Sequence, residues 1–397
     1  MDERGTEGRM YGLFDGFEEH RTPSEIDYKR LFETGMIALD SNVLLNLYRS
    51  SRRTREDLLA VLEHLRKRIW VPNQAVVEFW RNRGSEETLD HHRTKSNQAR
   101  QLLTRGRRGA LDILERWAKE VQVPFEDIES HRDELNSAFE GVLGMIAKQA
   151  EVNSIKEVGD TSKDPVLTRL EDILRGRVGP PMDKSSYEEA LREAKRRGES
   201  EEPPGYEDYK EKDDERAAGD YLIWEQTLSA ATERDCELLF VTGDSKKDWW
   251  RQRTAFTPAM PRIELMNEMR RRTGQRLFML TPSDLLRLAE EILEINVESS
   301  SVTDLERLEN AERDKQSSWR WDYDPDRESV VGDLPPEAVS QVEAMAESLT
   351  EIGDEISRDG GSGAKNFVMP DVIIQALVLE DRHQILIIGA LLIPGVG

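Results

Sequence analysis

The 397-residue sequence contains a single cysteine, Cys236, and its six histidines show no paired metal-binding spacing. One cysteine excludes an internal disulfide framework and a cysteine-based zinc cluster, and a lone thiol is typical of a reducing compartment. The sequence also lacks a glycine-rich motif of the P-loop or dinucleotide-binding type, so nucleotide binding of those two kinds has no support. No Ser-His-Asp or Cys-His set can be assembled from local context.

Long apolar runs are equally scarce. The first residues, MDERGTEGRM, contain none, which argues against a secretory signal. The apolar end, QILIIGALLIPGVG, is shorter than the roughly 20 residues of a membrane-spanning helix and contains Pro394. We therefore expect no membrane span and a cytoplasmic location. Two interpretations of this end stay open: a segment that binds a protein partner, or an abnormal reading-frame end.

Negative charge is in excess but is unevenly distributed. Residues 290–360 hold 21 Asp/Glu and 6 Lys/Arg, which is a net charge of -15 out of a total of -23. Such a composition with few aliphatic residues predicts a mostly disordered acidic region over residues 296–397, with one short helix around PPEAVSQVEAMAESL.

The segment 91–119 has the opposite charge, with 8 Lys/Arg and 2 acidic residues in a helical pattern. Two interpretations have equal weight: a solvated helix face, or a surface that contacts the phosphates of a nucleic acid. The arginines that would make such contacts are Arg93, Arg100, Arg105, Arg107 and Arg108.

Short apolar segments alternate with helical patterns along the rest of the chain. We expect strands at 36–39, 68–71, 237–241 and 276–280. Thr54, Asn73 and Thr281 are candidate N-caps of the helices that follow them, and residues from about 85 to 200 are charged and amphipathic. The alternation predicts an α/β fold with a mostly parallel sheet.

Acidic residues follow two of these strands directly, Asp40 in IALDSN and Asp244 in LLFVTGDSKKDWW. Because sites in parallel sheets form at the carboxyl ends of the strands, we expect these carboxylates to lie close together. Glu78 and Asp220, each early in a helix, can face the same crevice, and Asp248 can reach Asp244 across one turn.

Taken singly, each acid has a plainer interpretation as a helix cap, a turn residue or a first-turn acid. Together, clustered carboxylates repel one another unless some are protonated or a cation neutralises them. Hard divalent ions such as Mg²⁺ or Mn²⁺ suit oxygen ligands of this kind. The set therefore predicts metal-dependent hydrolysis of a phosphoryl bond.

Four segments carry a resemblance to a known family: IALDSNVLLNLY, IWVPNQAVVEFWRNR, PPGYEDYK with GDYLIWEQTL, and LLFVTGDSKKDWW. They resemble the PIN-domain nucleases, more closely the long bacterial PIN-like branch with a helical insertion between the second and third acidic motifs. The resemblance implies a Rossmann-like α/β/α domain over about 34–295, an insertion over about 85–205 and an N-terminal extension over 1–33. It also implies Mg²⁺- or Mn²⁺-dependent cleavage of nucleic acid, with RNA favoured over DNA.

The resemblance also assigns roles to individual residues. The catalytic, metal-binding acids of the four motifs correspond to Asp40, Glu78, Asp220 and Asp244, with Asp248 as a further metal ligand. Supporting positions correspond to Asn42, Thr242, Lys246 and Asp208. Gly243 departs from the pattern, because members of the long branch often carry another acid there.

Two alternative functions stay open. The spacing of Gly243, Asp244 and Asp248 fits the last motif of haloacid dehalogenase-type phosphatases, but Asn42 replaces the second acid of their Asp-x-Asp nucleophile motif. The other alternative is a non-catalytic binding or regulatory module with the PIN fold. The sequence does not indicate an oligomeric state.

Overall fold

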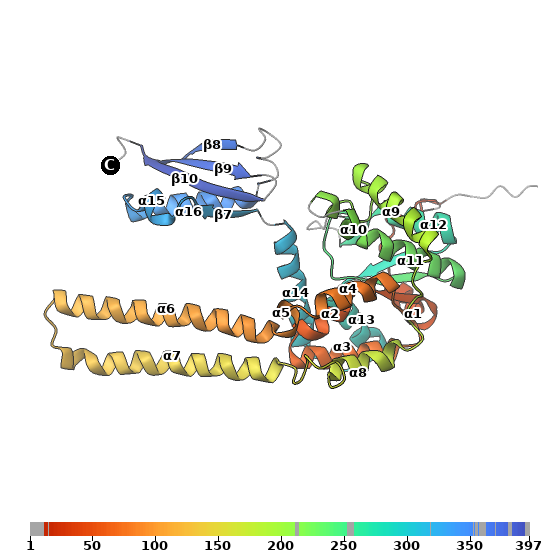
Figure 1. The fold of residues 1–397 in the computed structure, drawn as a ribbon, viewed down its shortest axis with the longest axis horizontal. Helices are drawn as coiled ribbons and strands as arrows, with labels where there is room; N and C mark the ends of the chain where they lie inside the picture. The colour runs from red at the N-terminus through yellow and green to blue at the C-terminus, as the bar shows by residue number, and fades with distance from the viewer. Residues whose placement is uncertain are drawn as a thin grey trace, which may run out of the picture. The chain divides into compact units, whose positions relative to one another are not determined.

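The computed structural model divides the chain into two compact units, residues 1–310 and residues 311–397 (Figure 1). The structure describes residues 12–14, 16–210, 214–251, 258–317, 319–351, 353, 356, 363–369, 371–379 and 383–393. Each unit has its own hydrophobic core.

The first unit is built on a four-stranded parallel sheet with the order β2-β1-β3-β6. The strands are β1 (Met36–Leu39), β2 (Ile69–Trp70), β3 (Leu238–Val241) and β6 (Leu277–Leu280). All four predicted strands are therefore present. The last residues of β1 and β3, Leu39 and Val241, pair directly, so the chain leaves both strands at neighbouring points of the same sheet edge.

Helices in two packed sets accompany this sheet. One set comprises α1 (Glu25–Thr34), α3 (Arg52–Leu65) and α13 (Pro282–Leu293); the other comprises α4 (Asn73–Arg83), α11 (Gly219–Arg234) and α12 (Ile263–Thr273). The helix α2 (Ser41–Arg49) contacts both α3 and α4. The result is the predicted Rossmann-like α/β/α arrangement.

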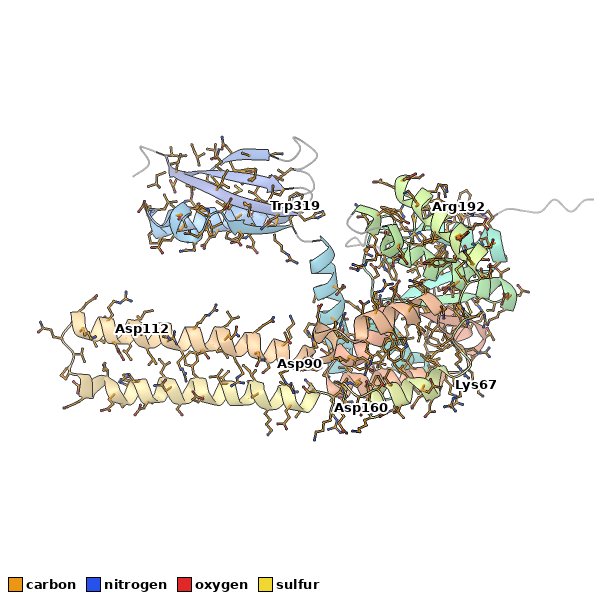
Figure 2. All side chains as sticks on the ribbon, viewed as in Figure 1. Lys67, Asp90, Asp112, Asp160, Arg192 and Trp319 are labelled. Atoms are coloured by element: carbon orange, nitrogen blue, oxygen red, sulfur yellow. The ribbon has the colours of Figure 1, made fainter. Side chains whose placement is uncertain are left out.

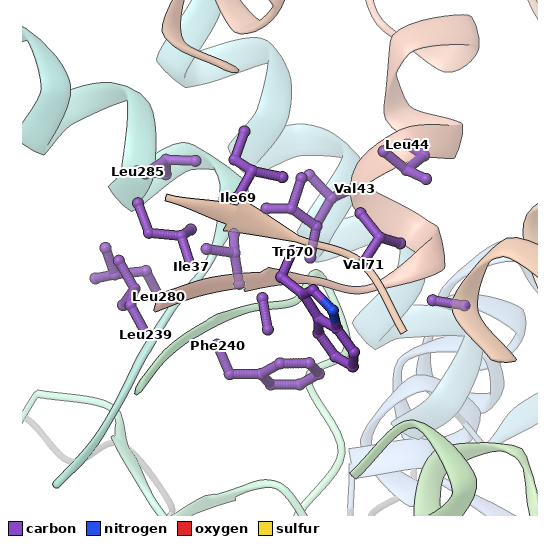
Figure 3. Packing of buried hydrophobic residues seen from close by; sticks show 14 of the residues in the cluster. Ile37, Val43, Leu44, Ile69, Trp70, Val71, Leu239, Phe240, Leu280 and Leu285 are labelled. Atoms are coloured by element: carbon purple, nitrogen blue, oxygen red, sulfur yellow. The ribbon is translucent and has the colours of Figure 1, made fainter. Parts of the chain in front are cut away.

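Every residue of β1, β3 and β6 is buried, which is typical of a parallel sheet covered on both faces. Figure 3 shows Ile37, Leu239 and Phe240 from the strands among the apolar side chains of the neighbouring elements. Leu31 and Phe32 of α1 are buried in the same cluster. The packed domain therefore begins at α1, ahead of the expected boundary at residue 34.

The segment between the second and third motifs is helical, as predicted. It contains α5 (Glu86–Leu89), α6 (His91–Glu120), α7 (Phe125–Asn153), α8 (Pro165–Leu174) and α9 (Lys184–Glu199). At 1.5 Å per residue, α6 and α7 are each about 45 Å long, and they pack side by side as an antiparallel hairpin. This hairpin extends away from the sheet and its helices (Figures 1 and 2), and Asp112 lies toward its outer part.

The remaining elements of the first unit are short, apart from α14. They are η1 (Glu18–His20), η2 (Asp208–Lys210), α10 (Asp214–Ala217), a two-stranded ribbon of β4 (Trp250–Arg251) and β5 (Met260–Pro261), and α14 (Ser299–Ser317), whose end passes into the second unit.

The second unit corrects the prediction of a mostly disordered acidic region. It contains β7 (Arg320–Tyr323), α15 (Arg327–Val331), α16 (Pro336–Glu351), β8 (Gly363–Val368), β9 (Val372–Leu379) and β10 (Gln384–Leu392), with the sheet order β7-β10-β9-β8. The predicted short helix corresponds to α16. Within the apolar end of the chain, Gln384–Leu392 form β10, which lies between β7 and β9.

The physical reason is the alternation of side chains along the strands. Val372, Ile374 and Ala376 of β9 point to the buried side and pack with Val342 and Leu349 of α16. Along such a strand, buried residues alternate with more exposed residues. A count of residue types over the whole region therefore shows a high acidic content and does not reveal the core. Among the helices that the structure describes, none has the length and apolar character to cross a lipid bilayer.

Candidate active site

The carboxylate of Asp40 lies where β1 ends and is held by three donors. Its Oδ2 accepts hydrogen bonds from Asn42 Nδ2 and Thr242 Oγ1, each at 2.7 Å. Its Oδ1 accepts from the backbone N–H of Ser41 at 2.5 Å, and Asp40 is the N-cap of α2. Asp40 therefore caps α2, and its carboxylate lies at the sheet edge where the candidate site is expected.

Asn42 joins the first motif to the fourth. Its Oδ1 accepts a hydrogen bond from the backbone N–H of Gly243 at 2.7 Å. A Cβ at position 243 would lie 3.3 Å from the same oxygen, which is tighter than an ordinary contact. The glycine that departs from the family pattern therefore lets the loop after β3 approach the start of α2 closely.

Lys246 lies among three of the predicted acids. Its Nζ is 2.7 Å from Asp208 Oδ1, 3.0 Å from Asp244 Oδ2 and 3.2 Å from Asp220 Oδ2. The backbone N–H of Lys246 also donates to Asp244 Oδ1 at 2.8 Å. Lys246 is thus a shared cationic partner of these carboxylates. The sequence-based expectation that the acids need a metal ion or protonation did not take this lysine into account.

Glu78 approaches the cluster from the first turns of α4. Its Oε1 accepts a hydrogen bond from Gln74 Nε2 at 3.1 Å, and its Oε2 accepts from Ser41 Oγ at 3.4 Å. Burial raises the pKa of Glu78 to about 7, and the charges of Asp40 and Asp220 add to this effect. The carboxyl group of Glu78 therefore changes its protonation state near neutral pH.

Gly219 is a site residue that sequence reasoning missed. A Cβ at this position, the first residue of α11, would overlap Glu78 Oε1. The residue next to Asp220 must therefore be small for Glu78 to reach the cluster. The only signal in the sequence is a glycine immediately before the third-motif acid. Because the start of a helix does not by itself require glycine, this signal did not indicate a role for Gly219.

Asp248 connects the loop at 203–208 to the site. Its Oδ2 accepts hydrogen bonds from the backbone N–H groups of Gly205 at 2.9 Å and Glu207 at 3.4 Å. Its buried Oδ1 has no hydrogen-bond partner in the part of the chain that the structure describes. Burial raises the pKa of Asp248 to about 6. The Pro-Pro-Gly loop therefore serves to position an acid of the fourth motif.

The tryptophans after Asp248 also pack against the site. Trp249 stacks on Phe240 of β3 with 5.0 Å between ring centroids, and its Nε1 donates to Asp220 Oδ2 at 3.4 Å. Trp250 Nε1 donates to the backbone oxygen of Asp244 at 2.7 Å. Both rings are buried, so their role is to hold the acids in place.

The cluster carries more negative charge than Lys246 offsets. Burial raises the pKa of Asp40, and it raises the pKa of Asp244 to about 7 even though Lys246 opposes the shift. Burial alone would lower the pKa of Lys246, but the surrounding carboxylates hold it well above its ordinary value. The six acids are Asp40, Glu78, Asp208, Asp220, Asp244 and Asp248.

The donor atoms of this cluster suit a hard divalent cation, because they are carboxylate oxygens and Asp248 Oδ1 is buried without a protein donor. In the described residues, no group of three or more His, Cys, Asp or Glu side chains surrounds a common point at metal-binding distance. Three of the acids instead face the ammonium group of Lys246. The type of donor atom fits Mg²⁺ or Mn²⁺, whereas three of the acids in this structure are arranged around Lys246.

The five arginines predicted to contact nucleic acid all lie on α6, and the structure separates them. A groove along the hairpin is lined by Asn97, Arg100, Gln101, Thr104, Arg105, Arg108 and Leu143. Arg107 forms an ion pair with Glu140 of α7, and Arg93 Nη1 is 3.5 Å from Asp90 Oδ1. Three of the five arginines therefore border an open groove, and two make ion pairs within the chain.

The comparisons with known proteins are consistent with this geometry. A family model described as a PIN-like domain matches residues 36–265, which include every acid of the cluster. No curated protein and no solved structure matches the chain. The matched segment spans more than half of the sequence, from β1 into α12, and has the α/β/α fold seen here. The chain belongs to the PIN-like domain family.

Proposed function

We propose that this protein is a metal-dependent nuclease that hydrolyses phosphodiester bonds, with RNA as the preferred substrate. The observation that carries the proposal is the cluster of six mostly buried acids, three of them in contact with Lys246, at the carboxyl ends of β1 and β3 in a PIN-like domain. The preference for RNA rests on the family resemblance.

The acids of the four motifs, together with Asp248, would hold Mg²⁺ or Mn²⁺. When bound, such an ion activates water and offsets the charge on the phosphate. Asn42 and Thr242 fix the orientation of the Asp40 carboxylate through the hydrogen bonds to Oδ2. Lys246 keeps the acids from the third and fourth motifs together. In-line attack by water would leave a 5′-phosphate and a 3′-hydroxyl.

The test is cleavage of end-labelled single-stranded and double-stranded RNA and DNA by the purified protein. We expect single-stranded RNA to be cut fastest. Cleavage of DNA alone would overturn the RNA preference and retain the nuclease. Absence of cleavage of every substrate, despite binding of Mn²⁺, would instead support the non-catalytic module.

The phosphatase alternative makes a different prediction, a phosphorylated aspartate at position 40. Both oxygens of Asp40 already accept hydrogen bonds from within the chain, and the family match is to the PIN-like domain. Neither observation favours the phosphatase.

The raised pKa values predict that metal binding strengthens as the pH rises. The carboxyl groups of Glu78 and Asp244, with pKa about 7, and Asp248, with pKa about 6, must lose protons to bind a cation. We therefore expect Mn²⁺ to raise the melting temperature more at about pH 8 than at about pH 6.

The metal-free protein should show the opposite trend. A carboxyl group whose pKa is raised by folding contributes stability below its unfolded-state pKa, and this contribution is lost as the pH rises through the folded-state value. The melting temperature without metal should therefore fall between about pH 5 and about pH 8, and Glu78→Gln should reduce the fall. An equal rise in melting temperature on adding Mn²⁺ at about pH 6 and about pH 8 would contradict the prediction that metal binding strengthens with pH.

The basic groove on α6 is the expected contact for the substrate backbone. Replacing Arg100, Arg105 and Arg108 by glutamate should weaken RNA binding about ten-fold or more. The slope of the logarithm of the binding constant against the logarithm of the salt concentration should become shallower by about 2. The measurement is fluorescence anisotropy at several salt concentrations in an Asp40→Asn background. The control is Arg192→Glu on α9, an exposed arginine of the globular part. If both variants bind like the parent, the groove is not the contact.

A further inference from the structure

The hairpin of α6 and α7 buries little within itself. Over helices of 30 and 29 residues, the described residues that are buried are Ser96, Ala118 and Ile128. Two long helices that meet along a single narrow seam leave two broad faces exposed. One of these faces is the basic groove beside Arg100, Arg105 and Arg108.

The face opposite the groove is apolar. On α6, three large side chains lie within about 60° of one another around the helix axis, on the side away from the groove arginines. They are Leu102, Ile113 and Trp117, which are 65%, 65% and 51% exposed. The side chains of α7 on the same face are Val142, Met145 and Val152, which are 41%, 64% and 46% exposed. Exposed apolar groups of this number on one face indicate a packing partner.

Several glycines also lie on the open surface of the hairpin. Gly106 and Gly109 of α6 and Gly141 of α7 lie mid-helix, where each destabilises the helix by about 1 kcal/mol relative to alanine. A Cβ at any of the three would meet nothing within 4 Å. Packing within the hairpin therefore does not require these glycines, and Gly144 of α7, next to the groove residue Leu143, is equally open.

The charges on the apolar face are arranged by position along the hairpin. At the tip, where α6 ends and α7 begins, the exposed Glu120 lies at the same angle around α6 as Leu102, and the exposed Asp127 lies at the same angle around α7 as Met145. At the base, the exposed Lys95 lies within about 20° of Leu102 around α6. The face is thus acidic at one end, apolar in the middle and basic at the other.

We infer that the apolar face is the interface between two copies of this chain, whose hairpins pack face to face and antiparallel as a four-helix bundle. A two-fold axis through the middle of the face places the acidic tip of each hairpin on the basic base of the other. It also buries the apolar side chains of both copies against each other, in the manner of a helix bundle. The groove on the other side of the hairpin stays accessible to a nucleic acid.

The first test is the mass of the full-length protein in solution, measured by light scattering and sedimentation equilibrium. We expect a dimer for the wild type and at least about 100-fold weaker association for the double variant Ile113→Glu/Trp117→Glu. The matched control, Arg105→Glu/Arg108→Glu, changes the same number of residues on the groove side and should remain a dimer. Far-UV circular dichroism of each variant establishes that the helices are retained.

The second test uses the predicted polarity. The tip-reversed variant carries Glu120→Lys; the base-reversed variant carries Lys95→Glu. Each variant alone should associate more weakly than the wild type, because like charges then face each other. A mixture of the two should form a heterodimer, because the reversed tip meets the reversed base and the unaltered ends still match.

Several results would overturn the inference. One is a wild-type protein that is monomeric at concentrations of about 100 μM. Another is a dimer that survives the Ile113→Glu/Trp117→Glu change, which would place the interface elsewhere. A third is loss of RNA binding by that double variant in a protein that is already monomeric, which would make the face a nucleic-acid surface. Failure of the two charge-reversed variants to associate when mixed would exclude the antiparallel arrangement.

Discussion

Asp40→Asn is expected to lower the rate of nucleic acid cleavage by about a thousand-fold or more. The substitution keeps the shape of the side chain and its ability to cap α2, but it removes a buried negative charge from the cluster. An asparagine side chain has one oxygen that accepts hydrogen bonds and one NH₂ group that donates them. It therefore cannot accept the bonds from Asn42, Thr242 and Ser41 together. The measurement is the single-turnover cleavage rate at saturating metal.

Stability separates this loss of activity from unfolding. Because burial raises the pKa of Asp40, the charged form is disfavoured in the folded protein, and Asp40→Asn should leave the metal-free melting temperature unchanged or higher. The control is Asp172→Asn, which alters an exposed carboxylate 3.7 Å from Arg175 on the surface. Retention of wild-type activity by Asp40→Asn would remove the first motif from the proposed site.

Arg83→Ala should destabilise the first unit by about 3–5 kcal/mol. Arg83 lies at the end of α4 and is buried, with Nη2 2.5 Å from Asp164 Oδ2 and Nε 3.0 Å from Tyr48 Oη. The same Nη2 donates to the backbone oxygen of Val158 at 2.7 Å. These contacts fix the chain that returns from the hairpin to α2 and α4, and Asp164 also caps α8. Removing the guanidinium leaves the Asp164 carboxylate buried without its cation.

The matched control is Arg169→Ala, an arginine on α8 whose ion pairs are exposed. Arg169 contacts Glu63 at 2.8 Å and Glu56 at 3.2 Å, and the side chains of all three are at least 36% exposed. Its loss should change the free energy of unfolding by no more than about 1 kcal/mol. Urea denaturation followed by circular dichroism measures both variants. Equal effects of the two changes would contradict the role given to the buried pair.

Much of the first unit could be predicted because its strands are short, fully buried apolar runs that differ sharply from the charged helices. Cap positions were harder to predict. Thr281 does cap α13, but α3 begins earlier than expected, at a cap formed by Ser51. Thr54, the predicted cap, instead donates its hydroxyl to Asp304 on α14. A local pattern cannot reveal a partner 250 residues away in sequence.

The location of the candidate site could be predicted from the sequence, and the contacts within it less so. Strand ends and family motifs brought all the predicted acids to one place, and Lys246 and Asp208 lie with them. The lysine's position among three carboxylates depends on how the loop after β3 folds over α11, which no single segment encodes. The same holds for Gly219, whose importance depends on the reach of Glu78 from another helix.

For the arginines of α6, the charge could be predicted from the sequence but the ion pairs could not. Their charge was evident in the sequence, but the ion pair of Arg107 with Glu140 depends on how two helices align. The apolar face of the hairpin was hidden for a similar reason, because its residues come from both helices and are diluted by charged neighbours.

The most direct test of the central claim is the metal dependence of cleavage by the wild-type protein beside the double variant Asp40→Asn/Asp244→Asn. Each would be freed of metal with EDTA, incubated with end-labelled single-stranded RNA, and then supplied with Mg²⁺ or Mn²⁺. We predict that the wild type cuts only after metal is restored and that the double variant does not cut in any condition. Cleavage by the wild type in EDTA, or equal cleavage by the double variant, would contradict a metal-dependent nuclease built on this carboxylate cluster.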